Sequence, residues 1–145
     1  MMPVGELAQE LPGVTVSGGR DRRVVDVTVD SRAVGVDWMF AALRGAQRNG
    51  LDYLDDAPGR GASAVMASAD RPGDLPGHVA WFSAADSREA LGRVSRRLHG
   101  APDEEVSVLG ITGTDGKTTT AHLLAAALEA SGWPAALGGT LGQRF

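Results

Sequence analysis

Residues 106–119 read VSVLGITGTDGKTT, a nearly continuous apolar run followed by a glycine-rich turn that ends in Gly-Lys-Thr. The run from Val106 to Ile111 is typical of a strand buried on both faces. After the turn, Lys117 to Ser131 has the apolar spacing of a helix, and Ala135 to Leu137 begins a second parallel strand. The stretch therefore predicts a strand–loop–helix–strand unit, which is the start of a parallel-sheet α/β domain.

The turn itself has the composition of a phosphate-binding loop. Lys117 is the only lysine in the chain, and its compact ammonium reaches between phosphate oxygens where a guanidinium fork fits poorly. Gly113 and Gly116 let the backbone adopt positive φ, so that successive N–H groups face an anion at the helix start. We expect Lys117 to bridge the terminal phosphates of a nucleotide and Thr118 to place its hydroxyl on Mg²⁺. A glycine turn capped by threonines, with no ligand, is the alternative.

The first hundred residues have the pattern of a separate small α/β domain. Residues 86–89 (Asp-Ser-Arg-Glu) predict a capping box that opens a helix, and Gly100 ends it. The polar segment 101–105 is expected to be a hinge between this domain (1–100) and the start of the second one (106–145). The predicted strands of the first domain are Val24–Val29, Met39–Leu43, Ala62–Ala67 and Val79–Phe82, with a short helix at Asp52–Ala57.

Composition narrows the class of protein. The net charge of -4 and the scattered arginines argue against a nucleic-acid binder. The absence of cysteine excludes disulfides and thiolate metal sites. No apolar run is long enough to span a membrane, and residues 1–11 lack the features of a secretory signal, so we expect a cytoplasmic protein. The three histidines are far apart in the sequence, and we assign none of them to a metal.

Gly110 to Thr120 (GITGTDGKTTT) closely resembles the phosphate loop of the Mur ligases, and most of all the members that add the third residue of the peptidoglycan stem peptide. The resemblance implies a small N-terminal Mur-type α/β domain followed by the start of a P-loop domain. Two departures stand out, since Val36-Asp37 replaces the usual Pro-Gly and Asp115 replaces the commonest Asn. Four N-terminal segments are similar to family motifs in the same order, namely Val29–Arg32 (VDSR), Phe40–Gly45 (FAALRG), Asn49–Tyr53 (NGLDY) and Gly61–Val65 (GASAV).

The resemblance implies an ATP-dependent amide ligase of cell-wall synthesis, and hence a role in cell shape and division. ATP and Mg²⁺ would activate the carboxylate of UDP-N-acetylmuramoyl-dipeptide for attack by an amino acid. The family's ATP contacts fall on Gly113, Thr114, Asp115, Gly116, Lys117, Thr118 and Thr119, with Lys117 in a catalytic role and Thr118 on the metal. Its UDP-sugar contacts fall on Val29, Ser31, Arg32, Ala46, Gln47 and Arg48.

Each transferred role has a structural alternative. Ser31 could only cap a turn, and Arg32 could only pair with a neighbouring carboxylate. Gln47 and Arg48 could belong to a solvated loop. The aromatic residues Trp38, Phe40 and Tyr53 are expected to be core.

The chain has one helix and two predicted strands after the hinge. We therefore expect no ligation by these residues alone. We also expect the segment 106–145 to pack loosely, to dock on the first domain, to self-associate, or to pair with a partner chain through its incomplete sheet. A non-catalytic UDP-sugar or ATP-binding subunit and an unrelated phosphate-loop NTPase are the other readings of the function.

Overall fold

The computed structural model of the chain describes residues 1–46, 48–139 and 142–144. The chain divides into two compact units, Met1–Val106 (unit 1) and Ser107–Phe145 (unit 2). No helix in the described ranges combines the length and the apolar character that crossing a bilayer requires.

A five-stranded sheet forms the centre of unit 1, in the order β2-β7-β6-β5-β4. The four strands from β7 to β4 run parallel to one another, and β2 joins the edge at β7 in the antiparallel direction. The α/β class predicted for the first domain is therefore confirmed, and its sheet is mainly parallel. The bounds are β2 (Val14–Ser17), β4 (Val27–Thr28), β5 (Met39–Ala41), β6 (Ala64–Ala67) and β7 (Ala80–Ala84), with a separate antiparallel pair of β1 (Met2–Pro3) and β3 (Arg23–Val24).

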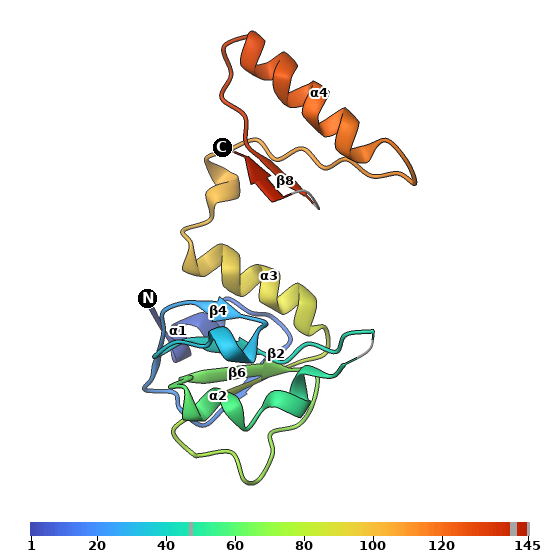
Figure 1. The fold of residues 1–145 in the computed structure, drawn as a ribbon. Coiled ribbons are helices and arrows are strands. Elements are labelled where there is room, and N and C mark those ends of the chain that lie inside the picture. The colour runs from blue at the N-terminus through green and yellow to red at the C-terminus, as the bar shows by residue number, and fades with distance from the viewer. Residues whose placement is uncertain (47, 140–141, 145) are drawn as a thin grey trace. The chain divides into compact units, whose positions relative to one another are not determined.

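Helices cover both faces of this sheet, and Figure 1 shows α3 and α2 on opposite sides of it. One core contains buried residues of α1 and α3 with Met39, Met66 and Phe82 of the sheet. The other contains Ala57 of α2 with the alternate strand residues, such as Val65 and Trp81. Because side chains alternate along a strand, strands that are apolar throughout fill both cores. The helical elements are α1 (Val4–Gln9), α2 (Asp56–Gly59), α3 (Ser87–Leu98), and the 3₁₀ turns η1 (Ser31–Ala33), η2 (Gly50–Tyr53) and η3 (Pro102–Glu104).

The strands β5, β6 and β7 and the helix α3 lie where the sequence predicts them. The short helix predicted at Asp52–Ala57 is wrong as a single element, because the chain forms the separate turns η2 and α2 there. The Asp86 carboxylate accepts hydrogen bonds from the backbone N–H groups of Arg88 and Glu89, at 2.9 and 3.0 Å, so α3 starts as predicted. Glu89 pairs with Arg93 on the next turn instead of reaching back. The single strand predicted at Val24–Val29 is wrong, because that segment divides into β3 and β4, which lie in different sheets.

The turn before β5 contains one of the positive-φ residues of unit 1 that are not glycine. Asp37 takes a left-handed conformation with φ 60°. Aspartate tolerates this region better than most residues with a side chain. Its carboxylate pairs with Arg22 at 2.8 Å, and its backbone N–H donates to the Gly61 carbonyl at 2.9 Å. The turn therefore forms without glycine because the fold holds Asp37 at both its side chain and its backbone.

Unit 2 contains the predicted helix, α4 (Lys117–Ala130), but not the predicted parallel strands. Residues 107–112 adopt no regular structure, and the side chain of Val108 is 75% exposed. β8 (Leu137–Gly139) pairs antiparallel with β9 (Gly142–Arg144). The strand predicted at Val106–Ile111 and its parallel pairing are therefore wrong for this chain. A parallel sheet needs further strands and cover on both faces, and the described residues of unit 2 supply neither.

Candidate functional site

The glycine turn before α4 has the backbone that an anion-binding loop needs. Gly113 and Gly116 have φ of 147° and 75°. Gly116 is the N-cap of α4, and the first helical bond runs from the Thr120 N–H to the Gly116 carbonyl at 2.9 Å. The N–H groups of the first helical turn consequently have no acceptor within the helix. A Cβ at Gly116 would meet no atom within 4 Å, so glycine is required there by conformation and not by space.

Lys117 folds back over this turn. Its Nζ donates to the carbonyl oxygens of Gly113, at 2.5 Å, and Thr114, at 3.2 Å. The ammonium therefore lies on the same turn as the first-turn N–H groups, where phosphate oxygens can replace the two carbonyls as its acceptors. Asp115 and Thr118 are exposed on either side of Gly116 and Lys117.

A metal ion at this turn would rely on the nucleotide for most of its ligands. No group of three or more histidine, aspartate or glutamate residues in the described ranges is placed to hold a metal. The exposed Thr118 hydroxyl is a hard oxygen donor of the kind that Mg²⁺ accepts, with phosphate oxygens and waters completing the shell. The residues of the turn fit Mg²⁺ bound together with a polyphosphate.

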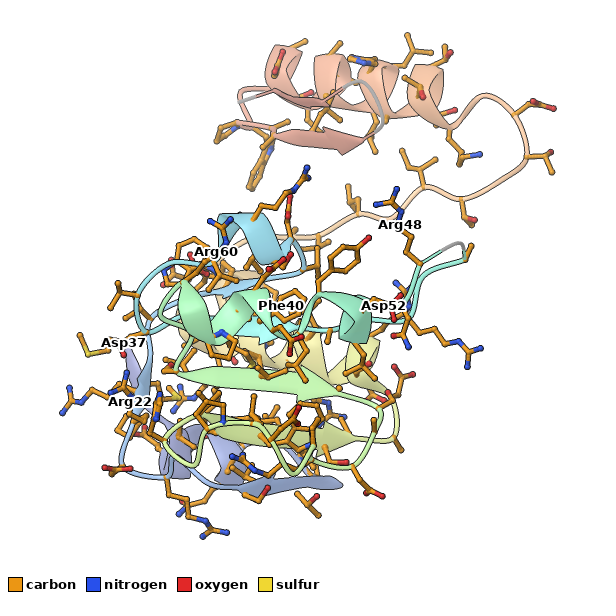
Figure 2. All side chains as sticks on the ribbon, turned by 60° about the horizontal axis from the view of Figure 1, so that its bottom comes forward. Arg22, Asp37, Phe40, Arg48, Asp52 and Arg60 are labelled. Carbon is orange, nitrogen blue, oxygen red and sulfur yellow. The ribbon has the colours of Figure 1, made fainter. Side chains whose placement is uncertain are left out.

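The residues predicted to contact a UDP-sugar lie in unit 1, at one end of the parallel sheet. β4 ends at Thr28 and the neighbouring parallel strand β5 ends at Ala41, so Val29–Arg32 and the loop containing Arg48 both follow carboxyl ends of strands. Ligands of open α/β sheets bind at such an edge. Figure 2 shows Arg48 and Asp52 at one end of the unit and the Arg22–Asp37 pair at the other.

The Val29–Arg32 segment forms a tight polar turn. Ser31 begins η1 and is 6% exposed, whereas Val29 is exposed. Asp30, and not Ser31, caps η1, because its Oδ1 accepts from the Arg32 backbone N–H at 3.0 Å. The Arg32 guanidinium also binds both carboxylate oxygens of Asp30, at 2.9 and 2.8 Å. The neighbouring-carboxylate alternative for Arg32 is therefore realised in this structure.

We expect the ion pair between Asp30 and Arg32 to persist at pH values below the usual pKa of an aspartate. The hydrogen bond from the Arg32 side chain, followed by that from its backbone N–H, lowers the pKa of Asp30 from the usual 3.8 to about 2. Because the folded-state pKa lies below the unfolded value, the contribution of Asp30 to stability is complete above pH 3.8 and is lost as the pH falls through about 2. An NMR titration of the Asp30 carboxyl carbon measures this pKa. A midpoint near 3.8 in the folded chain would contradict the prediction.

The second segment, between β5 and η2, is exposed. Ala46 and Arg48 are exposed, and Gln47 lies outside the described residues. Arg48 donates from Nη1 to the Tyr53 hydroxyl at 2.9 Å. Phe40 is 1% exposed and Tyr53 packs on the same core, so both belong to the core as predicted.

Sequence reasoning missed what supports this second segment. Asn49 and Asp52 form a capping box on η2, a spacing that the sequence does display. The contacts made by Tyr53 and Arg88 to the segment have no local sequence signal, since Arg88 lies 44 positions from its partner Arg44.

Comparison with known proteins finds similarity to the Mur ligases along the whole chain. Residues 111–144 match the model of the Mur ligase middle domain. The chain is 36% identical to the UDP-N-acetylmuramoyl-L-alanyl-D-glutamate–2,6-diaminopimelate ligase of Geobacter sulfurreducens over 144 aligned residues. The alignment covers 99% of this chain and 28% of the Geobacter protein. The chain thus spans less than a third of the length of this curated relative.

Solved structures agree with this match. The UDP-N-acetylmuramoylalanyl-D-glutamyl-2,6-diaminopimelate–D-alanyl-D-alanyl ligase of Acinetobacter baumannii superposes with a TM-score of 0.62 at 26% identity, over 89% of this chain and 28% of that one. The MurF ligase of Thermotoga maritima, solved in complex with ADP, superposes with a TM-score of 0.54 at 27% identity, over 75% of this chain and 23% of that one.

Proposed function

We propose that this chain, which is homologous to the N-terminal part of the Mur ligases, binds UDP-N-acetylmuramoyl-dipeptide through unit 1 and Mg²⁺-ATP through unit 2. The observation that carries the proposal is the reach of the similarity, which extends over 99% of the chain and so includes both candidate segments. The ligation proposed for the whole protein is addition of the third amino acid to the dipeptide. The name of the Geobacter relative makes 2,6-diaminopimelate the first amino acid to test. A cytoplasmic location follows from the proposed ligands, since both are nucleotides.

The proposed role of residues 113–119 is to hold and neutralise the nucleotide phosphates. The N–H groups of the turn and of the first helical turn donate to phosphate oxygens, and Lys117 supplies the positive charge. Thr118 would hold Mg²⁺, which would draw charge from the transferring phosphate group. Such a site acts by positioning and charge stabilisation, because a free carboxylate must be activated before an amine can attack it.

The proposed role of residues 29–48 is to bind the nucleotide end of the UDP-sugar. The proposed contacts to the UDP-sugar are Val29, Ser31, Arg32, Ala46, Gln47 and Arg48. Arg32 and Arg48 are the two cations among them, which suits a ligand with a diphosphate. For these residues the proposal is limited to binding, because the chain spans only 28% of its relative.

The test is calorimetric titration of the chain with UDP-N-acetylmuramoyl-L-alanyl-D-glutamate and, separately, with Mg²⁺-ATP. We expect both compounds to bind. Ser31→Ala should weaken binding of the UDP compound by about 3- to 10-fold, because one hydrogen bond to it is lost. Ser17→Ala, on the exposed face of β2, is the matched control and should bind normally. Because Ser31 is buried, its variant must also show the wild-type unfolding midpoint.

The same titrations separate the alternatives. Binding of ATP alone would favour an unrelated phosphate-loop NTPase. Binding of neither compound would contradict the proposal for both units.

We also infer that further polypeptide, as a second copy or a partner chain, covers the apolar residues that unit 2 exposes. Val108, Leu109, Leu123 and Trp133 are each more than 60% exposed. Apolar exposure on this scale in a 39-residue unit is typical of an interaction surface.

Hydrogen exchange tests this inference. In the isolated chain at low concentration, the amides of residues 108–111 should exchange at least about 100-fold faster than those of β6, because no described acceptor protects them. Equal protection of the two segments would mean that residues 108–111 already belong to a formed sheet. The inference would then be wrong.

A further inference from the structure

Backbone hydrogen bonds join the two ends of the segment between β5 and η2 (the 44–49 loop, of which residues 44–46 and 48–49 are described). Arg44 and Asn49 form an antiparallel bridge, and the Gly45 N–H donates to the Arg48 carbonyl at 2.8 Å. At the base of the loop, the Gly50 N–H donates to the Leu43 carbonyl at 2.8 Å. A Cβ at Gly50 would lie 2.6 Å from the backbone of Ala42, so this close approach requires glycine. The backbone of the loop is thereby closed on itself.

Two side chains from other elements hold the loop from outside. Tyr53, the last residue of η2, accepts a hydrogen bond at its hydroxyl from Arg48 Nη1 at 2.9 Å. Arg88, in the first turn of α3, donates from Nη2 to the Arg44 carbonyl at 2.9 Å. The first contact orients a side chain at the end of the loop, and the second anchors its start.

Tyr53 also lies close to the other proposed contact segment. Its phenol is one of the groups that raise the pKa of Arg32, after the hydrogen bond and the charge of Asp30. Its half-buried ring packs on the core of unit 1 that contains Val65 and Trp81. Tyr53 is therefore held by the core at its ring and bonded to Arg48 at its hydroxyl.

The hydroxyl of Tyr53 has no packing role that a phenylalanine could not fill. A phenylalanine at this position would keep the ring but would offer no acceptor to Arg48. A guanidinium has five N–H donors, so one bond to Tyr53 leaves the others for a ligand. Arg48 makes no ion pair with any carboxylate in the described ranges. Its position depends on Tyr53, while its charge stays available.

We propose that Tyr53 and Arg88 are positioning residues for the UDP-sugar site, which hold Arg48 and the 44–49 loop in the binding geometry before the ligand arrives. This inference rests on the proposed function of unit 1. Ordering a long side chain and a loop during binding costs affinity, and ordering them in advance avoids that cost. The two residues act through Arg48 and the loop backbone and need not touch the ligand.

The first experiment is a double-mutant cycle with uridine diphosphate as the probe. Tyr53→Phe should weaken its binding by about 3- to 10-fold, the effect of one side chain ordered only on binding. Arg48→Ala should weaken it at least as much. In the Arg48→Ala background, Tyr53→Phe should have no further effect, because the hydroxyl acts only through Arg48. Wild-type affinity in Tyr53→Phe, or a full additional loss in the double variant, would overturn the inference.

Arg88 has a matched control on the same helix. Arg93 lies in the next turn of α3 and pairs only with Glu89 among the described residues. Arg88→Ala should weaken uridine diphosphate binding, whereas Arg93→Ala should leave it unchanged. Equal binding by the two variants would remove Arg88 from the proposal.

A ligand-free measurement separates this inference from the proposed function. Tyr53 is the only tyrosine in the chain, so 3-fluorotyrosine labelling gives a single ¹⁹F resonance. Arg48→Ala should shift that resonance in the free protein, and Arg93→Ala should not. No shift would overturn the positioning role even if the chain binds uridine diphosphate. If Arg48→Ala shifts the ¹⁹F resonance but the chain does not bind uridine diphosphate, the proposed function is wrong. The contact between Arg48 and Tyr53 would then serve no nucleotide site.

Discussion

Replacing Lys117 by alanine is expected to weaken Mg²⁺-ATP binding by at least about 100-fold. The ammonium is the only side-chain cation on the turn, and its charge-assisted bonds to phosphate oxygens are worth about 3 kcal/mol together. Lys117→Arg should rescue little of this loss, because a planar fork cannot take the position of a compact ammonium between phosphates. Isothermal titration of the three proteins measures the effect. Uridine diphosphate binding by unit 1 is the internal control and should not change.

A second readout uses the fact that Lys117 is the only lysine. An amine-acylating reagent can modify only Lys117 and the N-terminus, so mass spectrometry after proteolysis follows the two sites separately. We expect Mg²⁺-ATP to slow acylation at Lys117 and to leave the N-terminal rate unchanged, because the bound phosphates occupy the ammonium. Equal acylation of Lys117 with and without ATP would support the alternative of a glycine turn with no ligand.

Replacing Trp81 by alanine is expected to destabilise unit 1 by about 3–5 kcal/mol. Trp81 is 1% exposed in the centre of β7, and its Nε1 donates to the Ala69 carbonyl at 3.1 Å. A domain of this size is stable by only about 5–15 kcal/mol, so the substitution removes from about a fifth of that stability to all of it. Urea denaturation followed by circular dichroism measures the change in the free energy of unfolding.

Trp133 is the matched control for Trp81. It is 69% exposed on unit 2, and its replacement by alanine should change the free energy of unfolding by no more than about 0.5 kcal/mol. Trp81→Phe should fall between the two, because it keeps a ring in the core and because Ser83 still donates to the Ala69 carbonyl at 2.9 Å. Equal destabilisation by Trp81→Ala and Trp133→Ala would contradict the two-core description of unit 1.

Local patterns predicted those parts of the fold whose causes are local. The carboxylate of Asp86 followed by helical spacing predicted α3, and the run Ala62–Ala67 predicted β6, which begins two residues later, at Ala64. α1 and β2 were missed, although Val14 and Val16 alternate with polar residues in the way that a half-buried strand does. The division of Val24–Val29 into two strands could not be predicted, because it depends on which sheet each half joins.

The candidate site shows the same limit. The glycine turn, Lys117 and the start of α4 follow from adjacent residues, so the sequence predicts their arrangement directly. The supports of the 44–49 loop do not, because Arg88 reaches Arg44 across 44 positions of the chain. Nothing local indicates that the Tyr53 hydroxyl accepts from Arg48.

By itself, the sequence determined the α/β class of unit 1, the helix that follows the lysine turn, and the positive-φ glycines on which that turn depends. Only the tertiary structure decided that Val106–Ile111 stays out of any sheet, that Val24–Val29 divides between two sheets, and that Arg88 holds the 44–49 loop. The physical reason is one of range. Caps, turns and helical periodicity are set by neighbours within a few residues, whereas a strand needs a partner strand and a positioned side chain needs a partner from elsewhere in the chain.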